Sequence, residues 1–127
     1  MFTTNNLRNI LLYIIIVFYF FAGLNHFVNP NFYYPLIPNY LGNKIVLNSV
    51  SGVAEIGLAL GFIFKITRQW AAIGTVLLLV AFIPAHIYFI TQHGCLSTSL
   101  CVPAWVAWVR LFPLQFILMA WAWYCRK

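Results

Sequence analysis

The sequence predicts an all-α fold, an integral membrane four-helix up-down bundle, and three observations predict it. Four apolar stretches each approach the roughly 20 residues that a helix needs to cross a bilayer. Charged residues make up only 6% of the 127 residues, whereas a soluble domain carries about 25%. Hydrophobic residues make up 64%, which excludes intrinsic disorder. The net charge of +6 is not gathered into a basic face, so nucleic-acid binding is excluded as well.

The expected spans are the four apolar stretches of one domain, residues 1–127: about residues 10–28, 46–64, 70–90 and 102–124. Asn29-Pro30 ends the first span, because a proline disfavours helical geometry in the residue before it. A short polar turn, residues 65–69, separates the second span from the third. Gly94 ends the third, and Pro103 begins the fourth, where a first-turn proline is tolerated.

Two further features bear on how these helices pack. Pro84 and Pro113 each remove one backbone donor inside a span, so we expect a kink near each. Gly57-x-x-x-Gly61 in the second span would permit close approach of a partner helix. The connections are short, which makes consecutive helices antiparallel neighbours.

The distribution of cations predicts the orientation of the bundle. If the N-terminus is cytoplasmic, Lys44 is the only cation of the outer side. The inner side then holds the other five cations that lie outside the spans: Arg8, Lys65, Arg68, Arg126 and Lys127. This asymmetry follows the positive-inside rule, so both termini are expected in the cytoplasm. Trp70, Trp105 and Trp123 fall near span ends, as in an aromatic belt.

Two opposite charges are expected at matching depth inside the bilayer. A charge near the centre of a spanning helix costs about 2.5–3.5 kcal/mol on insertion scales, so it needs a partner or an aqueous cavity. Glu55, the only acid of the chain, lies roughly 13 Å from the outer boundary, and Arg110 lies roughly 12 Å from it. We therefore predict a buried Glu55–Arg110 ion pair. It is either a structural clamp between the second and fourth helices or part of a functional site.

Two histidines stand at the outer ends of the first and third spans. His26 and His86 lie roughly 3–6 Å deep, so each of the four helices brings one ionisable group to the outer half. Small residues flank His26 and Glu55 on their helical faces, which indicates that both face other helices. The histidines are candidates for hydrogen bonding, proton transfer or ligand contact. A metal site is not expected, because the one carboxylate is assigned to arginine. Gln115 points elsewhere and serves another contact.

Three cysteines complete the set of reactive side chains. Cys95 and Cys101 share the second outer loop with the spacing C-x5-C, and a disulfide between them is expected in an oxidising compartment. The alternative is a dithiol that exchanges electrons with quinone, although such enzymes use a C-x-x-C pair, which is absent here. Cys125 lies near the cytoplasmic end and is expected to be a reduced, inert thiol.

In several blocks that span nearly the whole chain, the sequence resembles the DoxX family of small bacterial membrane proteins. The matching blocks contain the four ionisable groups and follow the family order: residues 21–27, 38–41, 51–55, 82–88 and 108–115. The resemblance implies a four-helix protein of the bacterial inner membrane. The family takes its name from a subunit associated with thiosulfate:quinone oxidation, and relatives are linked to sulfur metabolism and oxidative stress.

Three functions follow as hypotheses. In the first, the chain is a membrane subunit of a redox system, with peripheral or membrane redox partner proteins. A quinone-like or sulfur-compound ligand would then contact His26, Glu55, His86 and Arg110. In the second, the chain is a non-enzymatic scaffold for partner proteins, with a filled core. In the third, it is a small transporter, which would need a homo-oligomer because one bundle has little room for a pathway. Whether the chain is an enzyme stays open.

Overall fold

A computed structural model describes residues 3–96 and 101–127 of the chain. Four long apolar helical segments, each long enough to cross a membrane, cover Thr4–Val28, Lys44–Ile63, Arg68–Thr91 and Ala104–Tyr124. They overlap all four predicted spans, and the first begins six residues before the predicted start, residue 10. The predicted all-α fold with four membrane-spanning helices is therefore confirmed.

The first two spans are continuous helices, α1 (Thr4–Val28) and α3 (Lys44–Ile63), which pack against each other. Each begins at a side-chain cap. The Thr3 hydroxyl accepts a hydrogen bond from the backbone N–H of Asn6, and the Asn43 side chain accepts from Ile45 and Val46. These contacts satisfy backbone donors that lack a partner within the helix, so both starts are defined locally.

The third and fourth spans are each interrupted at the predicted proline. The third consists of α4 (Arg68–Ala81) and α5 (Ile83–Thr91), with Pro84 in the first turn of α5. The fourth consists of α6 (Ala104–Leu111) and α7 (Leu114–Tyr124), separated by the extended residue Phe112 and a cis Phe112–Pro113 bond. The two spans are neighbours, with α4 packed against α7 and α5 packed against α6.

The connection between α1 and α3 is a folded segment. It contains α2 (Pro30–Tyr33) and two short 3-10 helices, η1 (Tyr34–Leu36) and η2 (Asn39–Leu41). Leu36 and Pro38 are buried, and Leu36 packs in one cluster with Phe89 of α5 and Ala107 of α6. The segment therefore covers one end of the bundle.

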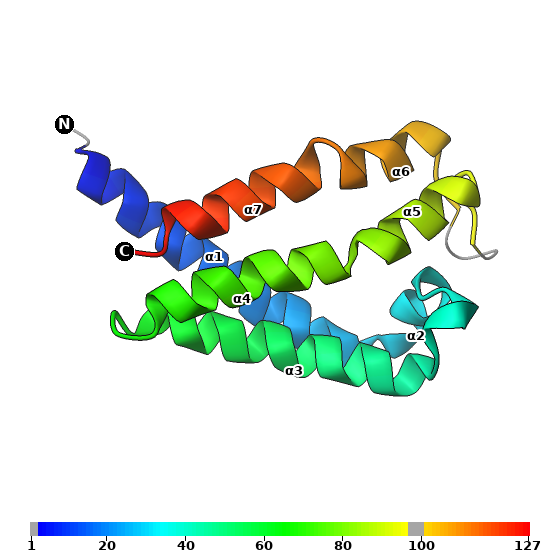
Figure 1. Cartoon of the computed structure of the whole chain (residues 1–127), viewed down its shortest axis with the longest axis horizontal. Coiled ribbons are helices and arrows are strands. Elements are labelled where there is room, and N and C mark those ends of the chain that lie inside the picture. The colour runs from blue at the N-terminus through cyan, green and yellow to red at the C-terminus, as the bar shows by residue number, and fades with distance from the viewer. Residues whose placement is uncertain (1–2, 97–100) are drawn as a thin grey trace.

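Figure 1 shows the two ends of the molecule. The N- and C-termini and the α3–α4 turn lie at one end, which we call the terminal end. The segment α2–η2 and the connection from α5 to α6 lie at the other, which we call the disulfide end because Cys95 and Cys101 are bonded there.

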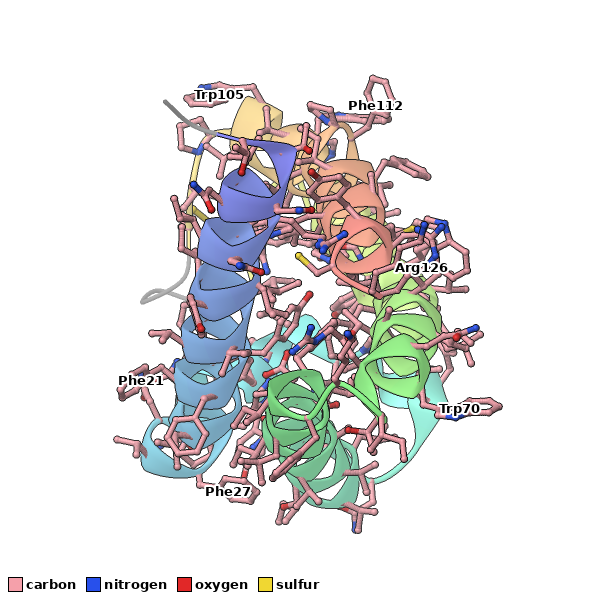
Figure 2. All side chains as sticks on the ribbon, turned by 90° about the vertical axis from the view of Figure 1, so that its left-hand side faces the viewer. Phe21, Phe27, Trp70, Trp105, Phe112 and Arg126 are labelled. Atoms are coloured by element: carbon pink, nitrogen blue, oxygen red, sulfur yellow. A yellow bond between two sulfur atoms is a disulfide. The ribbon has the colours of Figure 1, made fainter. Side chains whose placement is uncertain are left out.

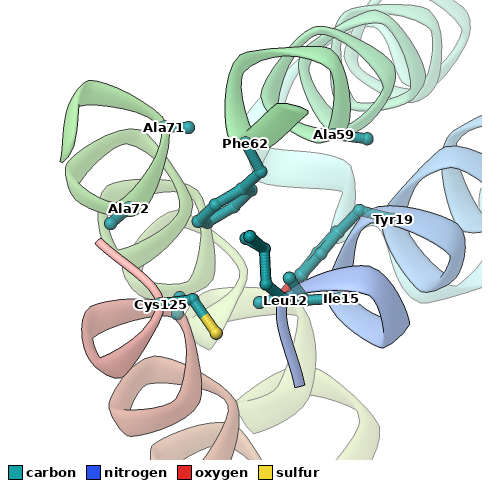
Figure 3. Packing of buried hydrophobic residues seen from close by; sticks show 9 residues of the cluster. Leu12, Ile15, Tyr19, Ala59, Phe62, Ala71, Ala72 and Cys125 are labelled. Atoms are coloured by element: carbon teal, nitrogen blue, oxygen red, sulfur yellow. The ribbon is translucent and has the colours of Figure 1, made fainter. Parts of the chain in front are cut away.

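The apolar core lies toward the terminal end, where α1, α3, α4 and α7 meet (Figure 3). Ile15, Phe62 and Ala72 are fully buried in it. The indole N–H of Trp121 donates to the backbone carbonyl of Leu11 at 3.1 Å, which joins α7 to α1. This half of the bundle is closed by packing, so open space is found toward the other end.

Large apolar side chains cover the outside of the bundle. Figure 2 shows Phe21, Phe27, Trp70, Trp105 and Phe112 pointing outward. Trp70 is 73% exposed and Trp105 is 66% exposed, as side chains in contact with lipid would be. The surface is consistent with a protein embedded in a bilayer.

Of the predicted glycine pair, Gly61 lies at a close helix contact and Gly57 does not, and a further close contact lies at Gly23 of α1. A methyl group at Gly57 would meet no atom of residues 3–96 or 101–127 within 4 Å, so this glycine serves no helix contact within that part of the chain. At Gly23 of α1, a Cβ would lie 2.6 Å from Ile56 and 2.7 Å from the carbonyl oxygen of Gly52. The prediction for Gly57 was wrong because the x-x-x spacing does not say which helical face meets a neighbour. Gly61 does pack against α4, where an added Cβ would lie 3.1 Å from that of Ala71.

The Cys125 thiol is fully buried in the terminal-end core, which predicts a low reactivity. Burial raises the pKa of this thiol, so the reactive thiolate is scarce at pH 8. In a non-ionic detergent we expect negligible labelling by N-ethylmaleimide over minutes, and complete labelling after denaturation in SDS. Lys127→Cys, at an exposed position, is the matched control and should be labelled at once. Equal rates for Cys125 and the control would contradict the buried position.

Candidate functional site

A cavity of about 500 Å³ lies between the terminal-end core and the disulfide end. It is lined by α1, α3, both halves of the third and fourth spans, and the segment α2–η2. The cavity has a mainly apolar wall that also contains nine polar residues: Tyr19, His26, Tyr33, Asn48, Ser51, Glu55, His86, Arg110 and Gln115. All four residues of the predicted ligand site are among them.

Glu55 reaches the cavity because α3 turns one face inward. The buried residues of this helix are Asn48, Gly52, Glu55, Ala59 and Phe62. They recur at intervals of three or four, which places them on a single face of the helix. Gly52 on this face lets α1 approach closely, and Glu55 is only 5% exposed.

The carboxylate of Glu55 is paired with His26. The Nε2 atom of His26 lies 3.3 Å from Oε2 of Glu55, and both side chains are buried. The other ring nitrogen, Nδ1, lies 2.6 Å from Oδ1 of Asn48. Asn48 donates through Nδ2 to the backbone carbonyl of His26 at 2.8 Å, which identifies Oδ1 as the acceptor. Nδ1 therefore carries a hydrogen, and the side chain of Asn48 fixes the orientation of the ring.

The predicted ion pair between Glu55 and Arg110 is not formed. Among residues 3–96 and 101–127, the salt bridge of Glu55 is with His26, and no nitrogen of Arg110 comes within 4.0 Å of the carboxylate. The guanidinium of Arg110 lies over the ring of Phe89, with Cζ 5.1 Å from the ring centroid. The prediction was wrong because equal depth does not fix the lateral distance. Arg110 lines the cavity from α6, which packs against α5.

Two buried polar atoms of the cavity lack a hydrogen-bond partner among the described residues. They are the hydroxyl of Tyr19 and Oε2 of Glu55. Oε2 lies near His26, but the contact is not aligned as a hydrogen bond. An unsatisfied buried polar group costs about 1–3 kcal/mol. Such atoms therefore favour occupancy of the cavity by water or by a ligand that supplies the missing partners.

Tyr33 is a site residue that the sequence did not single out. Its ring stacks on that of His26, with centroids 3.8 Å apart and planes inclined by 18°. The side-chain amide of Asn25 donates to its hydroxyl at 2.8 Å. Burial raises the pKa of Tyr33, so the phenol is neutral at physiological pH. Tyr33 is the last residue of α2, and the position of this short helix beside the cavity brings the ring inward.

His86 and Gln115 line the cavity from α5 and α7. His86 is half-buried. Gln115 is 2% exposed and donates through Nε2 to the backbone carbonyl of Leu79. This bond joins α7 to α4 near the break before α5, which supplies the separate contact expected for Gln115. The sequence signal for this cavity residue was a polar amide inside an apolar span.

The disulfide end contains the bonded cysteines. Cys95 and Cys101 form a disulfide, and the backbone N–H of Val102 donates to the carbonyl of Gly94 at 2.9 Å. Gly94 has a positive φ of 79°, which a residue without a Cβ adopts readily. Neither cysteine lines the cavity. Among the residues described, no three His, Cys, Asp or Glu side chains are grouped as metal ligands would be.

Comparison with known proteins gives one family. A family model described as a domain of unknown function (DUF8561) matches residues 15–126. No curated protein and no solved structure matches the chain. The matched range contains every polar residue that lines the cavity.

Proposed function

The chain belongs to the DUF8561 family, and we propose that this small multi-pass membrane protein binds a quinone-like or other small amphiphile among its helices. The observation that carries the proposal is the cavity with Oε2 of Glu55 on its wall, a carboxylate oxygen that accepts no hydrogen bond from the residues that the structure describes. A bundle that served only as a scaffold would be expected to fill this space with apolar side chains.

The cavity suits an amphiphile because its lining contains both polar side chains and partly exposed apolar side chains. The polar side chains that hold the head group come from all four spans. Phe18, Val50 and Leu114 line the same cavity and are 47%, 60% and 43% exposed. An apolar tail can therefore pass from the head-group site toward the lipid.

The resemblance to the DoxX family supports a redox setting for this ligand. In that setting the chain is a membrane subunit of the bacterial inner membrane, with both termini in the cytoplasm and a redox protein as its partner. The positive-inside distribution supports the orientation, since the terminal end holds the cations of the turn and of both termini. His26, Glu55 and Arg110 would contact the head group, with His86 beside them.

Thermal unfolding with an added quinone tests the proposal. We expect decylubiquinone to raise the Tm of the purified protein in a non-ionic detergent, because a ligand that binds only the folded state stabilises it. The buried Cys125 thiol can report unfolding through a thiol-reactive dye. Ala85→Phe, which fills the cavity, should abolish the shift, and Ala120→Phe on the exposed face of α7 should retain it. Equal shifts in both variants would contradict binding in the cavity.

A further inference from the structure

The charges of the cavity do not balance within the chain. Glu55 is the only Asp or Glu of the 127 residues, against seven Lys and Arg. Arg110 and Glu55 line the same cavity, and an arginine side chain stays protonated in proteins. Glu55 is therefore the only acidic side chain that could neutralise Arg110, but it is paired with His26.

The pair of Glu55 with His26 is neutral as a whole. Because Nδ1 of His26 donates to Asn48, a neutral ring would present the lone pair of Nε2 to Oε2 of Glu55 at 3.3 Å. Two acceptors at this distance repel each other, so a proton is held by one of them. The pair is then either histidinium with carboxylate or neutral histidine with carboxylic acid. In both forms it contributes no net charge.

Arg110 is consequently the uncompensated charge of the cavity. The neighbour that the structure gives its guanidinium is the face of the Phe89 ring. A cation–π contact does not neutralise the charge, and no other acidic side chain exists in the sequence. A positive charge in a largely apolar site is stabilised by an anion, and a guanidinium matches carboxylate, sulfonate or phosphate oxygens in a two-point contact.

We propose that the ligand of this cavity is an amphiphile with an anionic head group that pairs with Arg110. The inference rests on the proposed function and specifies its ligand class. Two further groups, the Tyr19 hydroxyl and Oε2 of Glu55, are more than nine-tenths buried, line the cavity and lack partners among the described residues. They offer hydrogen-bonding positions to a hydroxyl or ordered water that accompanies the anion.

The test compares probes that differ in charge and in tail. Dissociation constants are measured for laurate, methyl laurate, acetate and decylubiquinone with the purified protein in a non-ionic detergent. We expect laurate to bind at least about tenfold more tightly than methyl laurate, since the charge-assisted contact is lost in the ester. Acetate should bind far more weakly than laurate, because it has no tail.

Variants then test whether the preference for laurate over methyl laurate depends on Arg110. Arg110→Gln should weaken laurate binding at least about tenfold and leave methyl laurate nearly unchanged, whereas Arg110→Lys should retain much of the preference. Arg126→Gln, at the terminal end and outside the cavity lining, is the matched control and should bind laurate as the unmodified protein does. The comparison of laurate with its ester needs no variant, so it stands even if Arg110→Gln does not fold.

Several outcomes overturn the inference. Equal affinity for laurate and methyl laurate shows that the head-group charge is not recognised. An equal loss in Arg126→Gln and Arg110→Gln assigns the effect to general surface charge. Acetate binding as tightly as laurate indicates a free-anion site. If decylubiquinone binds and laurate does not, the proposed function survives and the anionic ligand class fails; if no probe binds, both fail.

Discussion

Replacing His26 by leucine is expected to lower the free energy of unfolding by about 3–5 kcal/mol. The substitution removes the partner 3.3 Å from the Glu55 carboxylate and the ring that Asn48 orients. A buried carboxylate without its partner is left in an apolar surrounding, where desolvation is costly. The measurement is unfolding in mixed micelles with increasing SDS, followed by far-ultraviolet circular dichroism.

The double variant His26→Leu/Glu55→Leu is the control for this expectation. It removes both members of the pair and should recover much of the loss, since no buried charge remains unpaired. Arg110→Ala discriminates the observed pairing from the predicted one. If Glu55 depended on Arg110, this variant would cost as much as His26→Leu; the observed geometry predicts a clearly smaller cost. A loss under 1 kcal/mol in His26→Leu would contradict the buried pair.

Gly52→Ala is expected to destabilise the protein by about 1–3 kcal/mol, because it overpacks the contact between α1 and α3. The added Cβ would lie 2.8 Å from Cβ of His26 and 3.0 Å from the carbonyl oxygen of Gly23. The helices must then separate at the point where His26 meets Glu55 and Asn48. Thermal unfolding in detergent measures the effect.

Gly57→Ala, on the same helix, is the matched control. Its Cβ would meet no atom within 4 Å, so the change only replaces glycine by a better helix former. We expect its Tm to stay the same or rise slightly. A fall of Tm as large as that of Gly52→Ala would show that α3 presents a different face to α1.

Hydropathy was sufficient to predict the four spans, because lipid requires each span to be long and apolar. The same rule made the cavity residues conspicuous, since Glu55, Arg110 and the two histidines are polar groups that lipid should exclude. Depth along each helix was therefore readable from position in the sequence. The rotation of each helix about its axis and the lateral distance between helices were not readable from the sequence. For this reason Glu55 was assigned to Arg110, whereas its partner in the structure is His26.

Other parts of the site depend on tertiary folding. Asn48 lies two helical turns before Glu55, on the same face, and this spacing was a readable signal for the amide that orients His26. Tyr33 had no such signal. It lines the cavity because two short helices, α2 with Pro30 as its first residue and η1 with Pro35 as its second, fold the connecting segment back over the bundle. That arrangement depends on contacts of Leu36 with α5 and α6, which are distant in the sequence.

Native mass spectrometry of the protein released from detergent tests the central claim most directly, namely that the cavity among the four spans holds a small amphiphile. We expect the unmodified protein to retain a molecule of definite mass. Ser51→Phe, which fills the cavity, should release it, and Val53→Phe on the exposed face of the same helix should retain it. A spectrum with only the bare chain in the unmodified protein, or equal retention in Ser51→Phe, would contradict the account.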